Sequence, residues 1–382
     1  GEEIIPEVMH VNWDIAAAKK GGYEHFMLKE IHEQPDALTN TISPRIINGL
    51  PDFSDDNIPD ELFKNIRRIV ITACGTAMHA GMFGRIMIEK YSRIPVSVEI
   101  ASEFRYSNPI LADDTLVIAI SQSGETADTL AAVRLAKSCG AKTLSVVNVK
   151  GSIIANESDY VLYTHAGPEI SVASTKAYVV QLSLMYLIAY RIAMVNGMLS
   201  DEAAANKVKG LFTAIDNMKK VLNMDEELYL ITNKLSKAED IFYLGRGLDY
   251  AIACEGSLKL KEISYIHAEA YAAGELKHGT ISLITDNVPV IAFATQEHIY
   301  QKVISNVVEV RSRGAYVILV TSAGKHVDTT LCDHHIILPR MDEEFTPFCT
   351  AVILQYLAYY TAVRRNLNVD QPRNLAKSVT VE

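Results

Sequence analysis

A loop rich in serine and glycine is the part of the sequence best suited to binding a charged ligand. It reads Ser121-Gln122-Ser123-Gly124-Glu125-Thr126 and lies between an apolar segment, residues 116–120, and a helical stretch, residues 126–138. The first amides of a helix have no intrahelical partner and carry the positive end of the helix dipole. The hydroxyls of the loop add donors, and glycine lets the backbone approach a ligand closely. The loop therefore predicts a site for a phosphate monoester.

The Ser/Gly loop has an alternative interpretation, and two other features of the sequence bear on its ligand. A plain Ser/Thr helix cap is the alternative interpretation, because many helices begin in this way. No lysine of the Walker type follows the loop, so a nucleoside triphosphate is not indicated. Cys74-Gly75-Thr76 follows a neighbouring predicted strand and could line the same crevice at the carboxyl edge of the sheet.

A second group of residues could move protons. We expect a helix over residues 250–266, on which Glu255, Lys259 and Glu262 are spaced i, i+4 and i+7 and share one face. His278 follows in a segment that contains glycines. A carboxylate, a lysine and a histidine could supply the acid and base groups for enolisation. The alternatives are a surface face of salt bridges and a histidine with a purely structural place.

The end of the chain, residues 370–382, follows a long apolar helix expected over residues 350–363. The segment has no amphipathic period, and its composition alone describes a frayed tail. Lys377 within it could form a Schiff base with a sugar carbonyl, provided that the fold buries the segment.

The elements that would position these residues alternate between strand and helix. Such a rhythm predicts parallel sheets with helices on both faces. The pattern occurs twice, with an offset of about 170 residues, so we predict two copies of one α/β domain. An apolar helix closes the first copy, and a polar segment, residues 196–209, links it to the second. The expected strands are residues 69–73, 116–120 and 143–147, then 241–244, 288–293 and 316–320.

The two copies differ after their central strands. The first copy has the Ser/Gly loop, whereas the second has Ala294-Thr295-Gln296-Glu297, with an acidic side chain and no glycine. One anion loop in a duplicated fold indicates one ligand site, to which the second copy contributes other chemistry.

Composition limits the class of protein. The chain has 382 residues, 49% of them apolar and 21% charged, which is typical of a globular protein of two or three domains. Its net charge of −10 argues against a protein that binds the phosphate backbone of nucleic acids. The apolar run of residues 179–195 is shorter than a membrane span needs, so we expect a buried helix, and no secretory signal opens the sequence.

The five cysteines are scattered and include no CxxC pair, which predicts a reduced, cytoplasmic protein without disulfides. Cys332, His334 and His335 come nearest to a metal cluster. Neighbouring side chains of a strand point to opposite faces, so we predict no metal site there. The chain begins with Gly1, and its polar opening has the character of a linker.

Taken together, these segments resemble the isomerase region of the glucosamine-6-phosphate synthases, which are glutamine:fructose-6-phosphate aminotransferases. The resemblance covers nearly the whole chain in order. The Ser/Gly loop alone would indicate only a phosphosugar domain of the sugar-isomerase type, whereas the tail is far more specific. The segments that carry the resemblance are residues 29–35, 73–76, 121–129, 172–176, 258–279 and 370–382.

The resemblance implies an α/β fold of two tandem sugar-isomerase (SIS) domains, each an αβα sandwich around a five-stranded parallel sheet. Residues 1–40 would be the linker and the start of the isomerase region, and residues 41–198 the first domain with the phosphosugar loop. Residues 199–366 would be the second domain with the acid/base groups, and residues 367–382 a catalytic tail.

The resemblance also assigns roles to residues. Glu262 would be the carboxylate that moves the C1/C2 proton, His278 the ring-opening acid/base, Lys377 the Schiff-base lysine and Lys259 an additional cation. The sugar phosphate and the rest of the substrate would contact Cys74, Gly75, Thr76, Ser121, Gln122, Ser123, Thr126, Val172, Ala173, Ser174 and Ala376. Ala77 departs from the family, whose members often carry a serine there.

The implied reaction converts fructose 6-phosphate and glutamine-derived ammonia into glucosamine 6-phosphate in hexosamine biosynthesis, without a metal or other cofactor, and with glucose 6-phosphate as a related ligand. His278 would come from the partner subunit of a homodimer. The family's glutaminase domain does not resemble any part of this chain, so we expect a fragment cut at the domain linker.

Two other functions fit parts of the sequence. An aldose–ketose isomerase acting alone would share the phosphate loop, but simple enolisation needs no Schiff-base lysine. A non-catalytic sensor of aminosugar phosphates would share the duplicated fold. The presence of Glu262, His278 and Lys377 together disfavours a sensor.

Overall fold

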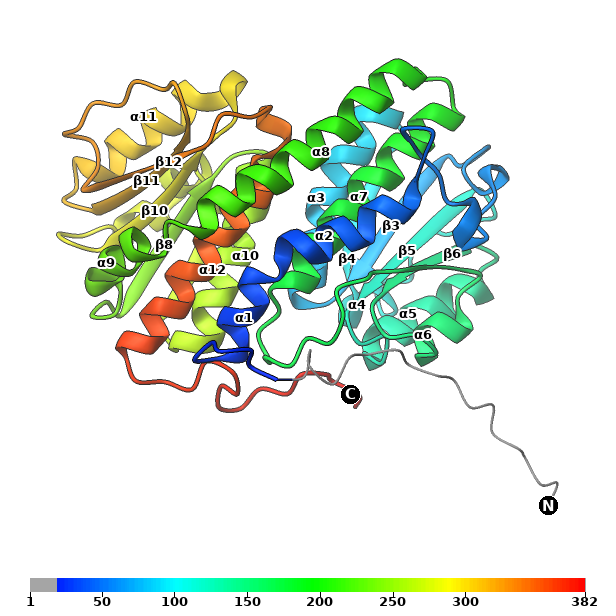
Figure 1. The fold of residues 1–382 in the computed structure, drawn as a ribbon, viewed down its shortest axis with the longest axis horizontal. Coiled ribbons are helices and arrows are strands. Elements are labelled where there is room, and N and C mark those ends of the chain that lie inside the picture. Colours follow the sequence, from blue (N-terminus) through cyan, green and yellow to red (C-terminus); the bar gives the residue numbers. More distant parts are fainter. Residues whose placement is uncertain (1–18, 382) are drawn as a thin grey trace.

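The structure is a computed structural model that describes residues 19–381. Residues 1–18 of the predicted linker, and Glu382 of the predicted tail, lie outside the described residues. Two α/β halves lie side by side, with helices between their sheets (Figure 1).

The first half is built on a parallel sheet with the strand order β4-β3-β5-β6-β7. Every residue of the central strand β5 is buried, because helices cover both faces of the sheet, and this explains its unbroken apolar run. The strands are β3 (Arg68–Ala73), β4 (Val96–Ile100), β5 (Thr115–Ser121), β6 (Lys142–Val147) and β7 (Tyr160–Tyr163). The helices are α3 (Gly75–Ser92), α4 (Ala101–Phe104), α5 (Ala127–Ser138), α6 (Ile153–Glu157) and α7 (Lys176–Val195).

The second half repeats this topology, with the strand order β12-β11-β10-β8-β9. The predicted pair of five-stranded parallel sheets is therefore confirmed. The strands are β8 (Asp240–Gly245), β9 (His267–Ala272), β10 (Pro289–Ala294), β11 (Tyr316–Ser322) and β12 (His334–Leu338). The α-helices are α10 (Leu248–Ser264), α11 (Tyr300–Arg311) and α12 (Thr346–Arg364), and the short 3₁₀ helices include η4 (Glu275–His278), η5 (Thr280–Leu283), η6 (Glu297–Ile299) and η7 (Glu343–Phe345).

The amino-terminal elements pack onto the core that the two halves share. One hydrophobic cluster extends from Met27 on α1 to Val369 beyond α12, so the halves are not separate bodies. These elements are α1 (Phe26–His32), α2 (Gln34–Ile42), the 3₁₀ helices η1 (Ser43–Arg45), η2 (Ser54–Asp56) and η3 (Asp60–Leu62), and the hairpin strands β1 (Ile46–Ile47) and β2 (Leu50–Pro51).

The link between the halves is more ordered than its polar composition indicated. Residues 196–209 include the beginning of a long helix, α8 (Asp201–Leu222), and a further helix, α9 (Asp225–Leu235), follows. The Ser200 hydroxyl caps α8 by accepting a hydrogen bond from the Ala203 amide. Buried residues such as Val208 and Leu211 recur at helical spacing along one face, and this face packs on the shared core.

Helix α7 is long and apolar enough to cross a membrane by composition alone, but 83% of that apolar window is buried inside the protein. It packs against α2 and α3 as a core helix, in agreement with the predicted buried helix.

In each sheet the chain leaves the first strand toward one edge and then crosses to the other side. The first strands, β3 and β8, therefore lie beside β5 and β10 at topological switch points, where open α/β sheets bind ligands beyond the carboxyl ends of their strands. The segment after β3 and the Ser/Gly loop after β5 meet at the first of these points.

Candidate active site

The Ser/Gly loop forms a compact turn with its hydroxyls gathered together. The Ser121 hydroxyl accepts a hydrogen bond from the Gly124 amide at 3.0 Å and lies 3.1 Å from the Thr126 hydroxyl. The Ser123 hydroxyl accepts from the Glu125 amide at 3.1 Å. Gly124 has φ +69°, and a Cβ there would come within 2.0 Å of the Ser152 hydroxyl oxygen, so only glycine fits.

Three amides of this loop, those of Gln122, Ser123 and Thr126, are left without a partner among the described residues. Gln122 and Ser123 follow the end of β5, and neither backbone N–H donates a hydrogen bond within that part of the chain. Cys74 directly follows the neighbouring strand β3, and burial raises the pKa of its thiol, so its side chain is neutral. The arrangement offers hydroxyl and amide donors that could bind an anion, and the phosphate site itself stays a prediction.

The carboxyl-terminal tail lies along this loop. Composition alone indicated a frayed end, but the Val379 carbonyl accepts a hydrogen bond from the Ala127 amide at 3.1 Å. The Ser378 hydroxyl donates to the Ser123 hydroxyl at 3.1 Å. Figure 1 shows the red tail running from the end of α12 back beneath α1 toward the first half. The fold thus delivers the tail to the predicted phosphate site.

Asp370 fixes the beginning of the tail. Its carboxylate accepts hydrogen bonds from the amides of Phe26 and Met27 at 2.9 and 2.8 Å, at the start of α1. Its carbonyl accepts a hydrogen bond from the Val172 amide at 2.9 Å. Asp370 therefore joins the tail to α1 and to the segment that contains Val172, Ala173 and Ser174.

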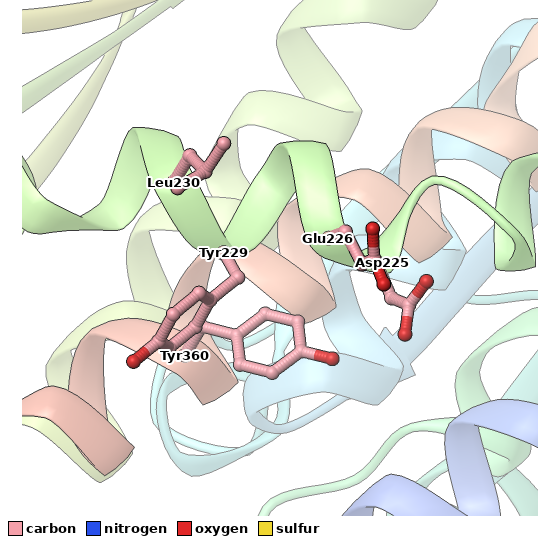
Figure 2. A pocket seen from close by; sticks show the side chains of 5 residues that line it. All are labelled: Asp225, Glu226, Tyr229, Leu230 and Tyr360. Atoms are coloured by element: carbon pink, nitrogen blue, oxygen red, sulfur yellow. The ribbon is translucent and has the colours of Figure 1, made fainter.

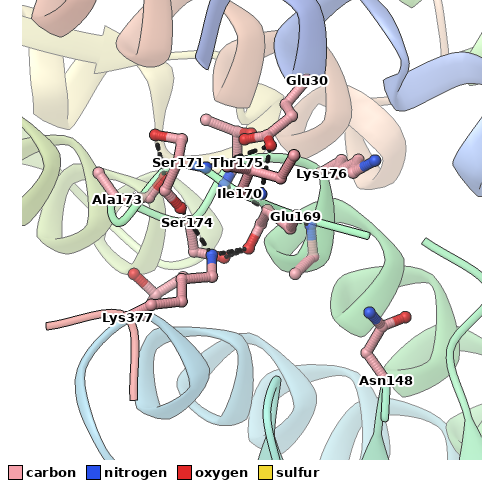
Figure 3. A network of polar contacts seen from close by, with 12 residues as sticks. Glu30, Asn148, Glu169, Ile170, Ser171, Ala173, Ser174, Thr175, Lys176 and Lys377 are labelled. Atoms are coloured by element: carbon pink, nitrogen blue, oxygen red, sulfur yellow. Dashed lines mark hydrogen bonds and ion pairs between the residues drawn. The ribbon is translucent and has the colours of Figure 1, made fainter. Parts of the chain in front are cut away.

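Lys377 is held in an ion pair beside that segment (Figure 3). Its Nζ donates to the Glu169 carboxylate at 2.5 Å and to the Ser171 carbonyl at 2.8 Å. Burial opposes ionisation of Glu169, but Lys377 and the amides of Thr175 and Ala177 hold the pKa of this carboxyl at about 2. Glu169 is therefore a buried anion that positions the predicted Schiff-base lysine.

A second buried carboxyl, Glu30 on α1, lies next to the segment that contains Ile170 and Ser171 (Figure 3). It accepts hydrogen bonds from the amides of Ile170 and Ser171 at 2.5 and 3.2 Å. Burial and the nearby charge of Glu169 raise the pKa of Glu30 to about 8, so the carboxyl is mostly protonated at neutral pH. Glu30 therefore supports the segment without adding a second full negative charge.

The predicted proton-transfer face on α10 is buried, unlike a surface face of salt bridges. Lys259 is fully buried, and its Nζ lies 2.8 Å from Glu262 and 3.3 Å from Glu255. Burial opposes its charge, but the two carboxylates raise the pKa of Lys259 above its usual value. Lys259 therefore remains an ammonium and does not act as a nucleophile. Its charge orients Glu262, whose side chain is partly exposed.

Helix α3 of the first half contacts this face directly. The Thr76 hydroxyl donates to Glu255 at 3.0 Å, and His79 Nδ1 donates to its other oxygen at 2.8 Å. Burial opposes ionisation, but Lys259, His79 and Thr76 hold the pKa of Glu255 below its usual range. Because Gly75 and Thr76 also border the Ser/Gly loop, the binding and proton-transfer groups meet between the two halves.

Not all of the predicted site residues come together. His278 is exposed on η4 and has no hydrogen bond or ion pair with Glu262 or Lys377 within residues 19–381. Ala376 is exposed next to Lys377. Printed contacts join several of the other predicted residues: the tail contacts Ser123 and Val172, and Lys259 contacts Thr76.

Two cavities of the described structure differ in whether a predicted site residue lines them. One, of about 420 Å³, includes the predicted site residue Gly75 and is lined by Gly75, His79, Cys254, Ser257, Leu258, Lys261, Glu269, Ala270 and Tyr271. The other, of about 350 Å³, is a surface hollow that contains no predicted site residue (Figure 2). It is lined by Asp225, Glu226, Tyr229, Leu230 and Tyr360.

Sequence reasoning missed three residues of the site. Glu169 and Glu30 stand alone in segments without periodicity, and only the fold brings them to Lys377. His79 is one turn after Thr76 on α3, so helical spacing could have placed the two on one face.

Comparisons with known proteins agree with the duplicated architecture. The family model described as "SIS domain" matches residues 62–191 and again residues 234–365. The glutamine–fructose-6-phosphate aminotransferases (isomerizing) of Clostridium acetobutylicum and Clostridium tetani are 51% and 52% identical to this chain over its whole length. The chain spans 63% of the length of each.

A solved structure is similar over its whole length. The C-terminal domain of glucosamine-fructose-6-phosphate aminotransferase from Francisella tularensis is 41% identical, with a TM-score of 0.89 over 92% of this chain and 100% of that one. The chain therefore belongs to the SIS domain family, and within that family it corresponds to the isomerase region of the glutamine–fructose-6-phosphate aminotransferases.

Proposed function

We propose that this chain converts fructose 6-phosphate and ammonia into glucosamine 6-phosphate, as the isomerase part of a hexosamine-forming aminotransferase. The observation that carries the proposal is the docking of Lys377 beside the Ser/Gly loop, in an ion pair with the buried Glu169. An amine in this place can reach a ligand whose phosphate binds that loop. All five cysteines are unpaired, which supports a cytoplasmic enzyme.

The phosphate of the substrate binds the amides and hydroxyls of residues 121–126. With the phosphate fixed, the sugar extends toward Lys377 and Glu262. His278 helps to open the furanose ring. Lys377 has to leave its ion pair with Glu169 and lose a proton to solvent, because an ammonium has no lone pair; the neutral Nζ can then add to the C2 carbonyl. Loss of water then gives an iminium, which withdraws electrons more strongly than the ketone.

Ammonia displaces Lys377 from C2, so the lysine is regenerated and the nitrogen of the product comes from ammonia. Glu262 then removes a proton from C1 and returns one to C2, which gives the 2-amino aldose. Lys259 keeps Glu262 oriented through their 2.8 Å contact. The relatives are longer than this chain, and we propose that a glutaminase domain in the full-length enzyme supplies the ammonia.

The phosphate assignment is open to a direct test. Ser123→Ala and Thr126→Ala should each weaken fructose 6-phosphate binding by about 1–3 kcal/mol, because each removes a hydrogen bond to a charged group. Isothermal titration with fructose 6-phosphate and with unphosphorylated fructose measures both effects. Ser138→Ala, on an exposed residue at the end of α5, is the control. Equal losses for both sugars would place the phosphate elsewhere.

The exposure of His278, apart from Glu262, supports a second proposal: a homodimer in which each site takes His278 from the partner subunit. Inactive His278→Ala and Glu262→Ala proteins should regain activity when mixed, because some mixed dimers contain one intact site. The measurement is fructose 6-phosphate isomerisation after subunit exchange has been verified by mass. Exchange without any recovery would put both residues in one subunit.

A further inference from the structure

The duplicated halves can be compared residue by residue at their switch points. β3 and β8 are each six residues long, and each is followed by a glycine with positive φ, Gly75 at +55° and Gly247 at +57°. Two residues after these glycines come Ala77 in the first half and Asp249 in the second. These two residues therefore occupy equivalent places in the first turns of α3 and α10.

The loops after the central strands also correspond. Val117 pairs with Val70 in the first sheet, and Val290 pairs with Phe242 in the second. Val70 and Phe242 are equivalent, since each is the third residue of its strand. Five residues beyond Val117 and Val290 are Gln122 and Thr295, so the free amides of Gln122 and Ser123 correspond to those of Thr295 and Gln296.

In the second half these amides are not free. The Asp249 carboxylate accepts the Thr295 amide at 2.8 Å and the Thr295 hydroxyl at 2.6 Å, and it also accepts the Gln296 amide. Asp249 is 1% exposed and has no ion pair with a lysine, arginine or histidine among the described residues. The donors of this loop stabilise the carboxylate, as the Ser/Gly loop would stabilise a phosphate.

We propose that Asp249 is a specificity-determining residue: its carboxylate fills, in the second half, the position that the sugar phosphate takes in the first. The chain then binds one phosphosugar although its topological switch point is duplicated. This inference rests on the proposed phosphate site. A carboxylate built into the chain loses no translational freedom on binding, and its charge repels a second anion, so an external phosphate does not displace it.

Burial raises the pKa of Asp249 to about 6, while the bonds from Thr295 and Gln296 act in the opposite direction. The carboxyl is thus mostly ionised at neutral pH, and it holds the loop as an anion. In the first half the side chain of Ala77 has no polar atom, so the amides of Gln122 and Ser123 remain available to a ligand.

The first experiment transfers the carboxylate. Ala77→Asp should weaken fructose 6-phosphate binding by about 100-fold or more, because an internal anion replaces the phosphate at two amides. Ala77→Asn has the same size without the charge and should lose much less. Wild-type affinity in Ala77→Asp, or equal losses in both variants, would overturn the inference. Ser123→Ala and Thr126→Ala report separately on the phosphate site itself: if they leave binding unchanged, it is the proposed function that fails.

The second experiment removes the carboxylate. In Asp249→Ala, and in the more conservative Asp249→Asn, hydrogen exchange of the peptide that contains Thr295 and Gln296 should accelerate by about tenfold or more, because the amides lose a charged acceptor. Inorganic phosphate should slow this exchange again in Asp249→Ala and have no effect there in the unsubstituted protein. Exchange that is unchanged by the substitution, or unaffected by phosphate in the alanine variant, would contradict the inference.

Discussion

Replacing Lys377 with arginine should abolish the covalent trapping of fructose 6-phosphate by borohydride, and with it the formation of aminosugar. Borohydride reduces the imine between Nζ and C2 to a stable amine, which peptide mass spectrometry locates. Arginine keeps the charge and can still pair with Glu169, but its guanidinium does not form an imine. The expected loss is therefore complete, while the tail retains the ion pair that holds it.

Lys176→Arg is the matched control. Lys176 is buried and, like the partly buried Lys377, is paired with a carboxylate: Glu33, at 2.8 Å. We expect the sugar to remain attached to Lys377 in this variant. Labelling of Lys176 or Lys259 in the unsubstituted protein would contradict the assignment. Lys259 is the less suitable nucleophile, because Glu255 and Glu262 stabilise its ammonium form.

The sequence predicted those parts of the fold that depend on local pattern. Buried strands such as β5 are continuous apolar runs, and the Ser/Gly loop ends such a run, so the strand, the loop and the following helix were all visible. The shared face of Glu255, Lys259 and Glu262 followed from helical spacing. The bounds of the predicted strands agreed to within a few residues, and β5, β8 and β11 end at a serine or a glycine.

The remaining features depend on contacts between residues far apart in the chain. Glu169 and Lys377 are separated by 208 residues, and nothing in either segment indicates the other. The docked tail has no periodicity of its own, because backbone bonds to Val172 and Ala127 hold it rather than an apolar face. Asp249 similarly looks like an ordinary acidic residue near a helix start until the fold brings it to Thr295.

Replacing Glu262 with glutamine separates proton transfer from imine formation. The glutamine side chain can still contact Lys259, but it cannot accept a proton from C1. Interconversion of fructose 6-phosphate and glucose 6-phosphate should therefore fall by about 10²–10⁴-fold, the usual contribution of a positioned general base. Borohydride trapping at Lys377 should persist, because addition to C2 does not require a base at C1.

Two comparisons make this result specific to the proposed role. Glu202→Gln, on an exposed glutamate in the first turn of α8, should retain both activities. Glu255→Gln removes a buried negative charge beside Lys259 but leaves Glu262 in place, so it should impair isomerisation less than Glu262→Gln does. If Glu262→Gln isomerised at the rate of the unsubstituted chain, the base would have to be another group. Glu169 would then be the first candidate, since it is the carboxylate in contact with Lys377.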